Sequence, residues 1–202
     1  MAKNLSSGAK TGLIVGGILL LVVLWFVSNY NKLVREEEKT TQAWAQVENA
    51  YQRRADLIPN LVKTVKGAAD FEKGTLESVI QARAEATSVR VDPTNLNEES
   101  IAAFEKAQNG LSASLGRLMM VVERYPELKA TENFKELQAQ LEGTENRISV
   151  ERKKFNECVQ AYNVKVRRFP TNIVAGIFGF ETKAYFKATE GAEKAPEVDF
   201  EF

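Results

Sequence analysis

Residues 131–169, TENFKELQAQLEGTENRISVERKKFNECVQAYNVKVRRF, contain the most regular apolar pattern in the chain. Spacings of three and four residues alternate over about five heptads, which predicts an α-helix with one face against a neighbouring helix. Thr131-Glu132 is typical of a helix start, and Phe169-Pro170 predicts its end. The predicted face consists of Phe134, Leu137, Leu141, Thr144, Ile148, Glu151, Phe155, Cys158, Tyr162, Lys165 and Phe169. This stretch therefore predicts the longest helix of the fold and a left-handed packing seam.

Two further stripes with the same spacing lie before this helix. The first consists of Leu33, Trp44, Val47, Tyr51, Ile58, Leu61 and Val65, with Glu37, Thr40 and Arg54 in its polar gaps. The second consists of Ile101, Phe104, Gln108, Leu111, Leu115, Leu118, Met119 and Val122. Asn97 with the acids after it predicts the start of the second helix, and Tyr125-Pro126 predicts its end. No alternating strand pattern precedes the C-terminal tail, so we expect an all-α fold: an elongated antiparallel bundle of three to four long helices over residues 31–187.

Breaks in these patterns predict where the rods bend or stop. Asp92-Pro93 and the turn-favouring residues around it predict a loop over residues 89–97. Pro59 removes one backbone hydrogen bond inside the first stripe, which predicts a helix kink there. The polar residues on or beside the seams have two interpretations, edge positions that cover the core with their aliphatic stems or a buried paired network that fixes the register. These residues are Glu37, Arg54, Thr144, Glu151 and Lys165.

The N-terminal stretch 11–30, TGLIVGGILLLVVLWFVSNY, carries no charged residue between Lys10 and Lys32. As a helix it would be about 30 Å long, the thickness of the hydrocarbon core of a bilayer. Trp25 and Tyr30 lie near one end, where membrane helices carry aromatic residues. We therefore expect a transmembrane helix at residues 11–30 after a short polar tail at residues 1–10. No helix breaker follows Tyr30, so this helix should continue into the bundle and hold it close to the membrane.

A cleaved signal peptide is the alternative for this stretch, because two lysines precede it. Residues 28–31, SNYN, offer no small-x-small cleavage site, which favours a retained anchor. The flanking basic residues divide almost equally between the two sides, Lys3 and Lys10 against Lys32, Arg35 and Lys39. The pair Arg53-Arg54 tips this balance slightly toward a cytoplasmic bundle and leaves the periplasmic side open.

Glycines recur every fourth residue at Gly8, Gly12 and Gly16. Small residues at this spacing let two transmembrane helices approach closely, so Gly12 and Gly16 are candidates for self-association. The alternative is that glycine is simply common in membrane helices.

The composition excludes several classes of chemistry. The chain has 202 residues and no histidine, which removes imidazole acid–base catalysis and histidine metal ligands. The single cysteine, Cys158, cannot form an internal disulfide and is interpreted as a small apolar residue of the seam. Twenty-seven basic and 27 acidic residues argue against nucleic-acid binding. No nucleophile lies beside a base and no phosphate-binding glycine loop exists, so we expect no enzyme activity, cofactor, bound metal or small-molecule substrate.

Several motifs, taken in order, resemble the LemA family. They are Leu57-Ile58-Pro59-Asn60-Leu61-Val62, Ala82-Arg83, Tyr125-Pro126-Glu127-Leu128-Lys129-Ala130, Leu141-Glu142-Gly143-Thr144-Glu145-Asn146-Arg147-Ile148, Arg152, Phe155-Asn156, Tyr162-Asn163, Phe169-Pro170-Thr171-Asn172 and Gly179-Phe180. They cover roughly residues 30 to 187. The resemblance implies a bacterial, single-pass inner-membrane protein with an N-terminal anchor, an all-α antiparallel bundle and no established enzymatic activity.

One departure from the family pattern is visible at Phe71-Glu72. Family members often carry a His-Glu pair there, so a role that needs an imidazole at this position cannot apply to this chain.

Three groups of residues are candidate sites. The first is a polar set that we expect to form hydrogen bonds between helices: Arg83, Glu142, Glu145, Asn146, Arg152 and Asn156. The second is the apolar segment 169–186, where Thr171 or Asn172 should cap a short helix that Gly179 ends. The segment either folds back over the bundle or, through Phe178, Phe180 and Phe186, meets a neighbouring subunit or the bilayer. The third is an extended acidic and aromatic tail at residues 188–202, where Phe200 and Phe202 could bind a partner protein or remain free.

Two functions follow from this architecture. The favoured hypothesis is a non-enzymatic scaffold, anchored in the bacterial inner membrane, that assembles with copies of itself. The alternative is an adaptor that presents its bundle or its C-terminal tail to another envelope membrane protein, such as a protease or a signalling component.

Overall fold

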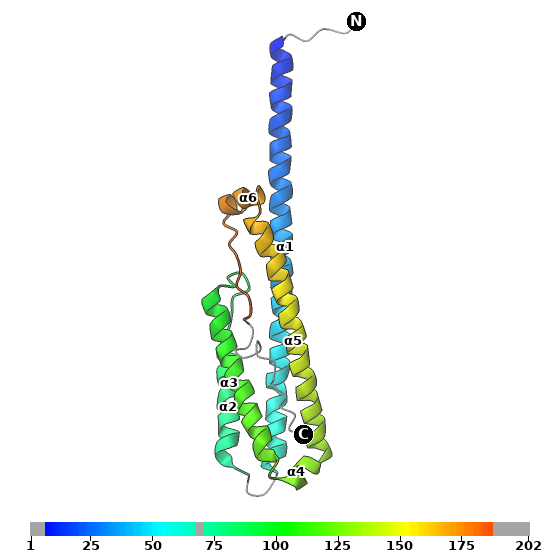
Figure 1. Ribbon diagram of the computed structural model, residues 1–202, viewed down its shortest axis with the longest axis vertical. Helices are drawn as coiled ribbons and strands as arrows, with labels where there is room; N and C mark the ends of the chain where they lie inside the picture. Colours follow the sequence, from blue (N-terminus) through cyan, green and yellow to red (C-terminus); the bar gives the residue numbers. More distant parts are fainter. Residues whose placement is uncertain (1–6, 68–70, 188–202) are drawn as a thin grey trace, which may run out of the picture.

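The computed structural model describes residues 7–67 and 71–187, and in these ranges every regular element is a helix. The elements are α1 (Ser7–Lys66), α2 (Lys73–Ser88), α3 (Glu98–Val122), α4 (Pro126–Ala130), α5 (Glu132–Arg167) and α6 (Thr171–Phe178). Consecutive long helices run in opposite directions along one axis, and the N-terminal part of α1 projects beyond the bundle (Figure 1). The predicted all-α fold with an elongated antiparallel bundle is confirmed.

Helix α1 has 60 residues and joins the apolar N-terminal stretch to the bundle without a break, as the sequence predicted. It passes through Pro59 without ending, and the kink predicted at this residue stays a prediction. At 60 residues against 36, α1 and not α5 is the longest helix, which corrects the expectation from the heptad pattern. That expectation compared the apolar stripes of the bundle alone. Because no stop signal lies between Tyr30 and Leu33, the membrane segment and the first stripe form one helix, which is longer than α5.

The core lies in three successive groups along the bundle axis, and α1 contributes to each. Leu33 lies in the group nearest the projecting helix, Trp44 and Val47 in the middle group, and Leu61 in the far group. All seven apolar residues predicted for the first stripe are buried. Helix α5 packs along the length of the bundle part of α1, and the α2–α3 hairpin covers the lower part (Figure 1).

Local signals fix several helix ends. The side chain of Asn97 accepts a hydrogen bond from the backbone N–H of Ser100, and that of Thr131 accepts one from Phe134. Gly179 ends α6 with φ at 74°, a left-handed conformation that suits glycine. The expected cap of α6 is wrong: Pro170 occupies the cap position, and no side chain bonds the first turn.

Two further expectations about the helices are corrected. The helix of the second stripe, α3, ends at Val122 rather than at Tyr125-Pro126, because Pro126 is the first residue of the short helix α4. Near the end of α5 the heptad pattern also fails, since Phe169 lies beyond the helix and is 75% exposed. The buried residues there are Val159, Tyr162, Asn163 and Val166.

Candidate membrane interface

The projecting part of α1 presents large apolar side chains on all its sides. Leu13, Leu20 and Leu24, for example, are 66%, 60% and 56% exposed, and none of the most apolar stretch is buried in the protein. Within the described residues, α1 is the one helix long and apolar enough to cross a membrane. A helix that is apolar all round needs an apolar solvent, which fits the predicted membrane segment.

Helix α6 packs against α1 at the point where this apolar stretch meets the bundle (Figure 1). The ring of Tyr30 lies 4.8 Å from that of Phe178 and 5.6 Å from that of Phe180, measured between ring centroids. The hydroxyl of Thr171 donates a 3.4 Å hydrogen bond to the Asn29 side-chain oxygen. These contacts place α6 at the level of the last turn of the predicted membrane segment.

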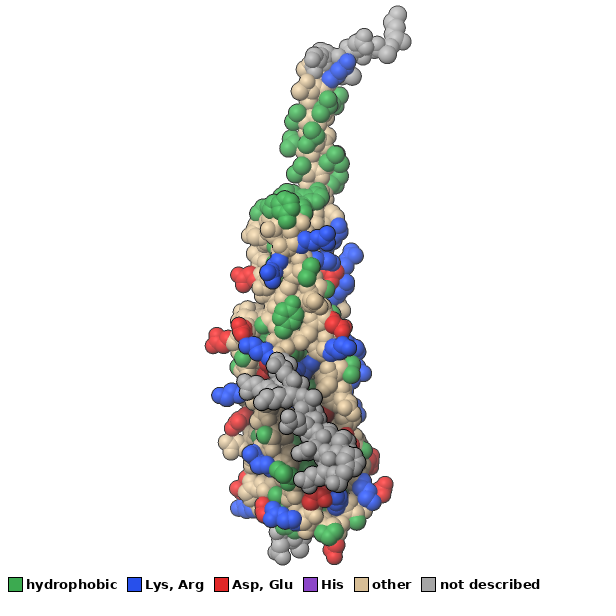
Figure 2. Space-filling model, in the orientation of Figure 1, with side chains coloured by type: hydrophobic (Ala, Val, Ile, Leu, Met, Phe, Trp, Pro, Cys, Tyr) green, Lys and Arg blue, Asp and Glu red, His purple; other side chains and the backbone are tan. Residues whose placement is uncertain are grey.

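Only one side of α6 faces the protein. Val174 and Ala175 are buried against Leu33 and the end of α5, whereas Ile173, Ile177 and Phe178 are 46%, 63% and 54% exposed. Figure 2 shows hydrophobic side chains gathered around the base of the projecting helix. We call the exposed residues Phe169, Ile173, Ile177 and Phe178 the apolar collar.

Basic residues border the apolar collar. Lys32 and Arg35 follow Tyr30 on α1, and Arg167 and Arg168 lie at the end of α5, separated from α6 by two residues; all four are exposed. The first acid after Tyr30 on α1 is Glu36, and the first acid after α6 is Glu181. Cationic side chains next to an apolar surface are typical of protein faces that meet phospholipid headgroups.

Glu36 forms an ion pair with two lysines. The ammonium of Lys165 on α5 donates a 2.5 Å hydrogen bond to Oε1 of Glu36, and Lys39 donates a 3.1 Å bond to the same atom. These two lysines hold the pKa of the Glu36 carboxyl below its ordinary value, although burial opposes them. The ion pair ties α1 to α5 two turns below Tyr30.

Residues 180–187, which we call the strap, run from α6 back along the bundle. Asn163 binds the backbone of Lys183 through two hydrogen bonds, donating to its carbonyl at 2.8 Å and accepting from its N–H at 2.9 Å. Asn156 binds the backbone of Phe186 in the same way, at 3.0 and 2.9 Å. Each asparagine side chain therefore makes the two backbone hydrogen bonds that a neighbouring β-strand would make.

The spacing of the two asparagines matches the spacing of their targets. Seven residues along an α-helix rise about 10.5 Å, and three residues of extended chain span about 10 Å. Asn163 thus meets Lys183, and Asn156 meets Phe186, in register along α5. On the other side of the strap, the N–H of Ala184 donates a 2.8 Å hydrogen bond to the carbonyl of Leu96.

Phe186 closes the aromatic core of the middle group. Its ring stacks on Trp44 at 5.7 Å and meets Phe155 edge-on at 5.4 Å, and the Arg152 guanidinium lies 4.6 Å from its centre. With 4% of its surface exposed, Phe186 is a core residue of its own chain and not, as we expected, an interface candidate. The strap thus folds back over the bundle, while α6 remains at its end.

Arg54 forms a buried polar network deeper in the bundle. Its side chain is 1% exposed and donates hydrogen bonds to Glu145 and Ser112, each at 2.6 Å, and to the Gln108 side chain at 2.7 Å. Gln108 in turn donates to the carbonyl of Ala86. One guanidinium therefore joins α1, α3 and α5, and Gln108 extends the contact to α2. Arg54 is buried and paired, but its partners are not the other four polar residues predicted on or beside the seams.

The other members of the predicted polar set do not share this network. Arg83 donates to the carbonyl of Ala55, and Arg152 pairs with Glu105. Glu142 accepts a bond from Gln138 on the same helix. The set is therefore distributed over separate contacts, several of them between helices.

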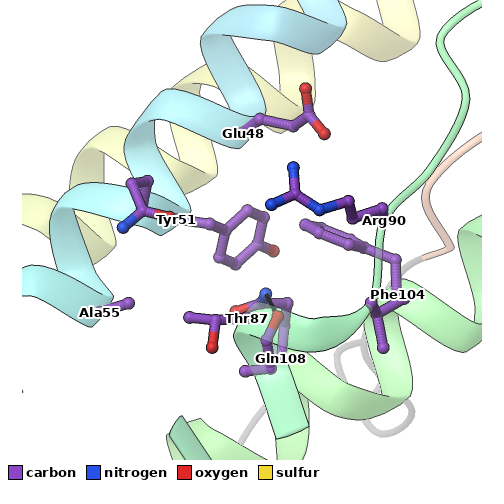
Figure 3. Close-up of a pocket in the computed structure, with 10 residues that line it drawn as sticks. Glu48, Tyr51, Ala55, Thr87, Arg90, Phe104 and Gln108 are labelled. Atoms are coloured by element: carbon purple, nitrogen blue, oxygen red, sulfur yellow. Dashed lines mark hydrogen bonds between the residues drawn. The ribbon is translucent and has the colours of Figure 1, made fainter. Parts of the chain in front are cut away.

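A cavity of about 100 Å³ lies beside the Arg54 network (Figure 3). Tyr51, Phe104 and Gln108 point into it, and Glu48 and Arg90 lie at its rim. Burial raises the pKa of the Tyr51 hydroxyl and that of the Glu48 carboxyl. The volume is below the ~300 Å³ of typical small-molecule sites. Among the described residues, no group of three or more acidic or cysteine side chains could hold a metal ion.

The comparison with protein families matches residues 43–200, which include most of the bundle described above. The chain belongs to the LemA family.

Similar proteins agree with this assignment. Magnetosome protein MamQ 2 of Paramagnetospirillum magneticum is 28% identical over 204 residues, which cover 92% of this LemA-family chain and 75% of MamQ 2. Magnetosome protein MamQ of Magnetospirillum gryphiswaldense is 27% identical, covering 83% of this chain and 68% of its own. Protein LemA of Metamycoplasma hominis is 25% identical, covering 86% and 76%.

The remaining predicted site residues fall into two groups. Gly12 and Gly16 lie in the projecting part of α1, and a Cβ atom added at either would meet nothing within 4 Å. Phe180 is half-buried against Tyr30, and Phe178 is exposed. Phe200, Phe202 and the predicted tail at residues 188–202 lie outside the described residues.

Sequence reasoning missed Asn163 and Lys183, two buried polar residues of this LemA fold. The available signal was the seven-residue spacing of two asparagines on one predicted helix, Asn156 and Asn163. Such a pair can bind an extended segment, but nothing in the sequence identified residues 180–187 as that segment.

Proposed function

We propose that this LemA-family chain is a non-enzymatic scaffold that is anchored in a bacterial membrane and assembles with copies of itself. The single observation that carries the proposal is α1, one helix of 60 residues whose outer part is apolar and exposed and whose inner part belongs to the bundle core. Such a rod transmits position from the bilayer to the bundle without a flexible joint.

A role without chemistry is supported by the residues themselves. The chain has no histidine, and burial raises the pKa of the Cys158 thiol, which reduces its thiolate fraction. The polar residues inside the bundle are engaged in contacts between helices, as the Arg54 network illustrates. The names of the similar proteins refer to the magnetosome and to the family, and none of them states a reaction.

Self-assembly is supported by the glycine face of α1. Gly12 and Gly16 lie on one side of the helix, and open space surrounds both in a single chain. Substitutions there therefore cause no clash within the chain, so their effect reports contact with another helix.

The test is the mass of the full chain in mild detergent, measured by light scattering at several protein concentrations. We expect species larger than a monomer, and we expect Gly16→Leu to shift them toward the monomer. Gly17→Leu is the matched control, because Gly17 also has open space around it but lies about 100° away around the helix.

A monomer at every concentration would contradict the scaffold. Deletion of residues 198–202 separates the scaffold from the adaptor. Loss of a different membrane protein from the complex, with self-association intact, would favour the adaptor.

A further inference from the structure

We propose that α6 lies in the headgroup–acyl boundary of the phospholipid bilayer, so that the bundle contacts lipid at a second site beside the membrane span of α1. This inference rests on the anchored part of the proposed function and adds the partner of the apolar collar. It is carried by the depth of α6, by its exposed residues and by the basic residues around it.

The depth of α6 follows from its contacts with α1. The group of core residues that contains Val174 and Ala175 packs against Trp25 and Phe26, which lie within the predicted membrane segment. Phe178 contacts Tyr30, the last residue of that segment. A bilayer that covers residues 11–30 therefore reaches the level of α6, whatever else the protein binds.

The exposed face of α6 has the chemistry that this depth requires. No charged residue occurs between Arg168 and Glu181, and the collar residues Ile173 and Ile177 lie one turn apart on the side that faces away from the bundle. Phe169 adds a ring that is 75% exposed. An exposed apolar surface bordered by basic residues is typical of helices that lie in the membrane interface.

The position of α6 is fixed before any lipid binds. Gly179 turns the chain at the end of α6, and the strap then runs into the bundle, where Asn163 and Asn156 hold its backbone. At the other end, Arg168 accepts a 2.9 Å backbone hydrogen bond from Asn172. The collar is therefore presented by a rigid support and does not depend on a segment that must first fold.

The apolar collar is continuous with the apolar surface of α1, which favours lipid over a second copy of the chain as its partner. The collar joins the apolar surface of α1 through Tyr30, and the acyl chains that cover that surface would also border α6. The exposed cations Lys32, Arg35, Arg167 and Arg168 lie within a few residues of Tyr30 or of α6 in the sequence, and their charge complements that of anionic headgroups. A second copy would bring the same cations against one another.

The experiment uses the full chain reconstituted into vesicles of phosphatidylcholine and phosphatidylglycerol. Cys158 is first replaced (Cys158→Ala), and an environment-sensitive fluorophore is attached through Ile177→Cys, whose native side chain is 63% exposed. The matched control carries the label through Met120→Cys, which is 66% exposed on α3. Circular dichroism confirms that each labelled protein keeps its helix content.

We expect the label at position 177 to emit at shorter wavelength and to be quenched several-fold more strongly by nitroxide lipids than the label at position 120. Equal, weak quenching at both positions would overturn the proposal. A short-wavelength emission without nitroxide quenching, which fades when the protein is diluted with lipid, would also overturn it and would place a second copy on the collar.

Alkaline carbonate extraction separates this proposal from the anchor itself. Protein that stays in the vesicles while position 177 remains in water would overturn only the role of α6. Protein released by carbonate would overturn the membrane-anchored scaffold as well.

Discussion

The outer and inner parts of α1 share one helical backbone and have opposite surroundings. In the outer part, side chains on every face are apolar and exposed, with Leu20 at 60% and Leu21 at 67%. In the inner part, apolar residues such as Leu33 and Trp44 form one stripe that is fully buried, while the remaining faces are polar. The periodicity of the apolar residues, more than their number, therefore decides whether a segment requires lipid or protein around it.

The largest expected effect comes from a substitution that removes a core residue of the inner part. Trp44→Ala deletes a ring in contact with Phe104, Phe155 and Phe186 and should lower the free energy of unfolding by about 3–5 kcal/mol. The measurement is chemical unfolding of the full chain in detergent micelles, followed by far-ultraviolet circular dichroism.

The outer part of α1 offers the matched control. Val22 is 46% exposed, and Val22→Ala should change the stability of the bundle by less than about 0.5 kcal/mol. An equal loss of unfolding free energy in Trp44→Ala and Val22→Ala would contradict the difference in surroundings between the inner and outer parts of α1.

The next effect concerns the polar residue that the inner part buries. Arg54→Met keeps an unbranched apolar stem but is shorter and has no donor, so the buried side-chain oxygen of Gln108 loses its hydrogen bond, at a cost of about 1–3 kcal/mol. Glu145→Gln should cost less than about 1 kcal/mol, because the glutamine oxygen can still accept the hydrogen bond from Arg54 and the Glu145 side chain is 46% exposed. A gain of stability in Arg54→Met would mean that the network fixes register and adds no stability.

The helical stripes could be predicted from the sequence because each one follows a local rule. Spacings of three and four identified the buried residues from Leu33 to Val65, and Asn97 capped α3 as expected. The pattern lost accuracy toward the end of α5, where Val159 and Val166 are buried in place of the predicted Cys158 and Lys165. A straight helix of 3.6 residues per turn drifts by about 20° per heptad, so a strict heptad misplaces residues after several repeats.

The strap and the collar depend on tertiary contacts that no local rule supplies. Phe186 lies in a segment without periodicity, and only its contacts with Trp44 and Phe155 make it a core residue. The contact of α6 with α1 joins Tyr30 and Phe178, which are 148 positions apart in the sequence. Periodicity detects a face that is buried, whereas it cannot identify the segment that buries it.

The third prediction sharpens the contrast between the strap and α6. Asn163→Ala removes both hydrogen bonds to the backbone of Lys183 and should lower the local opening free energy by about 1–2 kcal/mol. Amide exchange at Lys183 should then accelerate roughly tenfold, and the measurement is hydrogen–deuterium exchange of the full chain in micelles. Gln160→Ala, an exposed position on the same helix, is the control and should leave this exchange unchanged.

The smallest effect is expected at the boundary between the two parts of α1, where Glu36 is the first acid. The hydrogen bond from Lys165, and then that from Lys39, hold the pKa of Glu36 below its ordinary value of 4.5. A carboxyl whose pKa is lower in the folded state contributes stability above its unfolded pKa and loses this contribution as the pH falls through the folded value. Glu36→Gln should therefore destabilise the bundle by up to about 1 kcal/mol at neutral pH.

The pH dependence distinguishes this ion pair from a simple change of packing. The difference in unfolding free energy between wild type and Glu36→Gln should shrink as the pH falls below 4.5, because the wild-type carboxyl then becomes protonated. Urea unfolding at pH 7 and at progressively lower pH measures the difference, with the exposed neighbour Glu38→Gln as control. A difference that stays constant over this range would assign the effect of Glu36 to packing at the junction of α1 and α5, and the ion pair would then contribute nothing to holding the outer helix on the bundle.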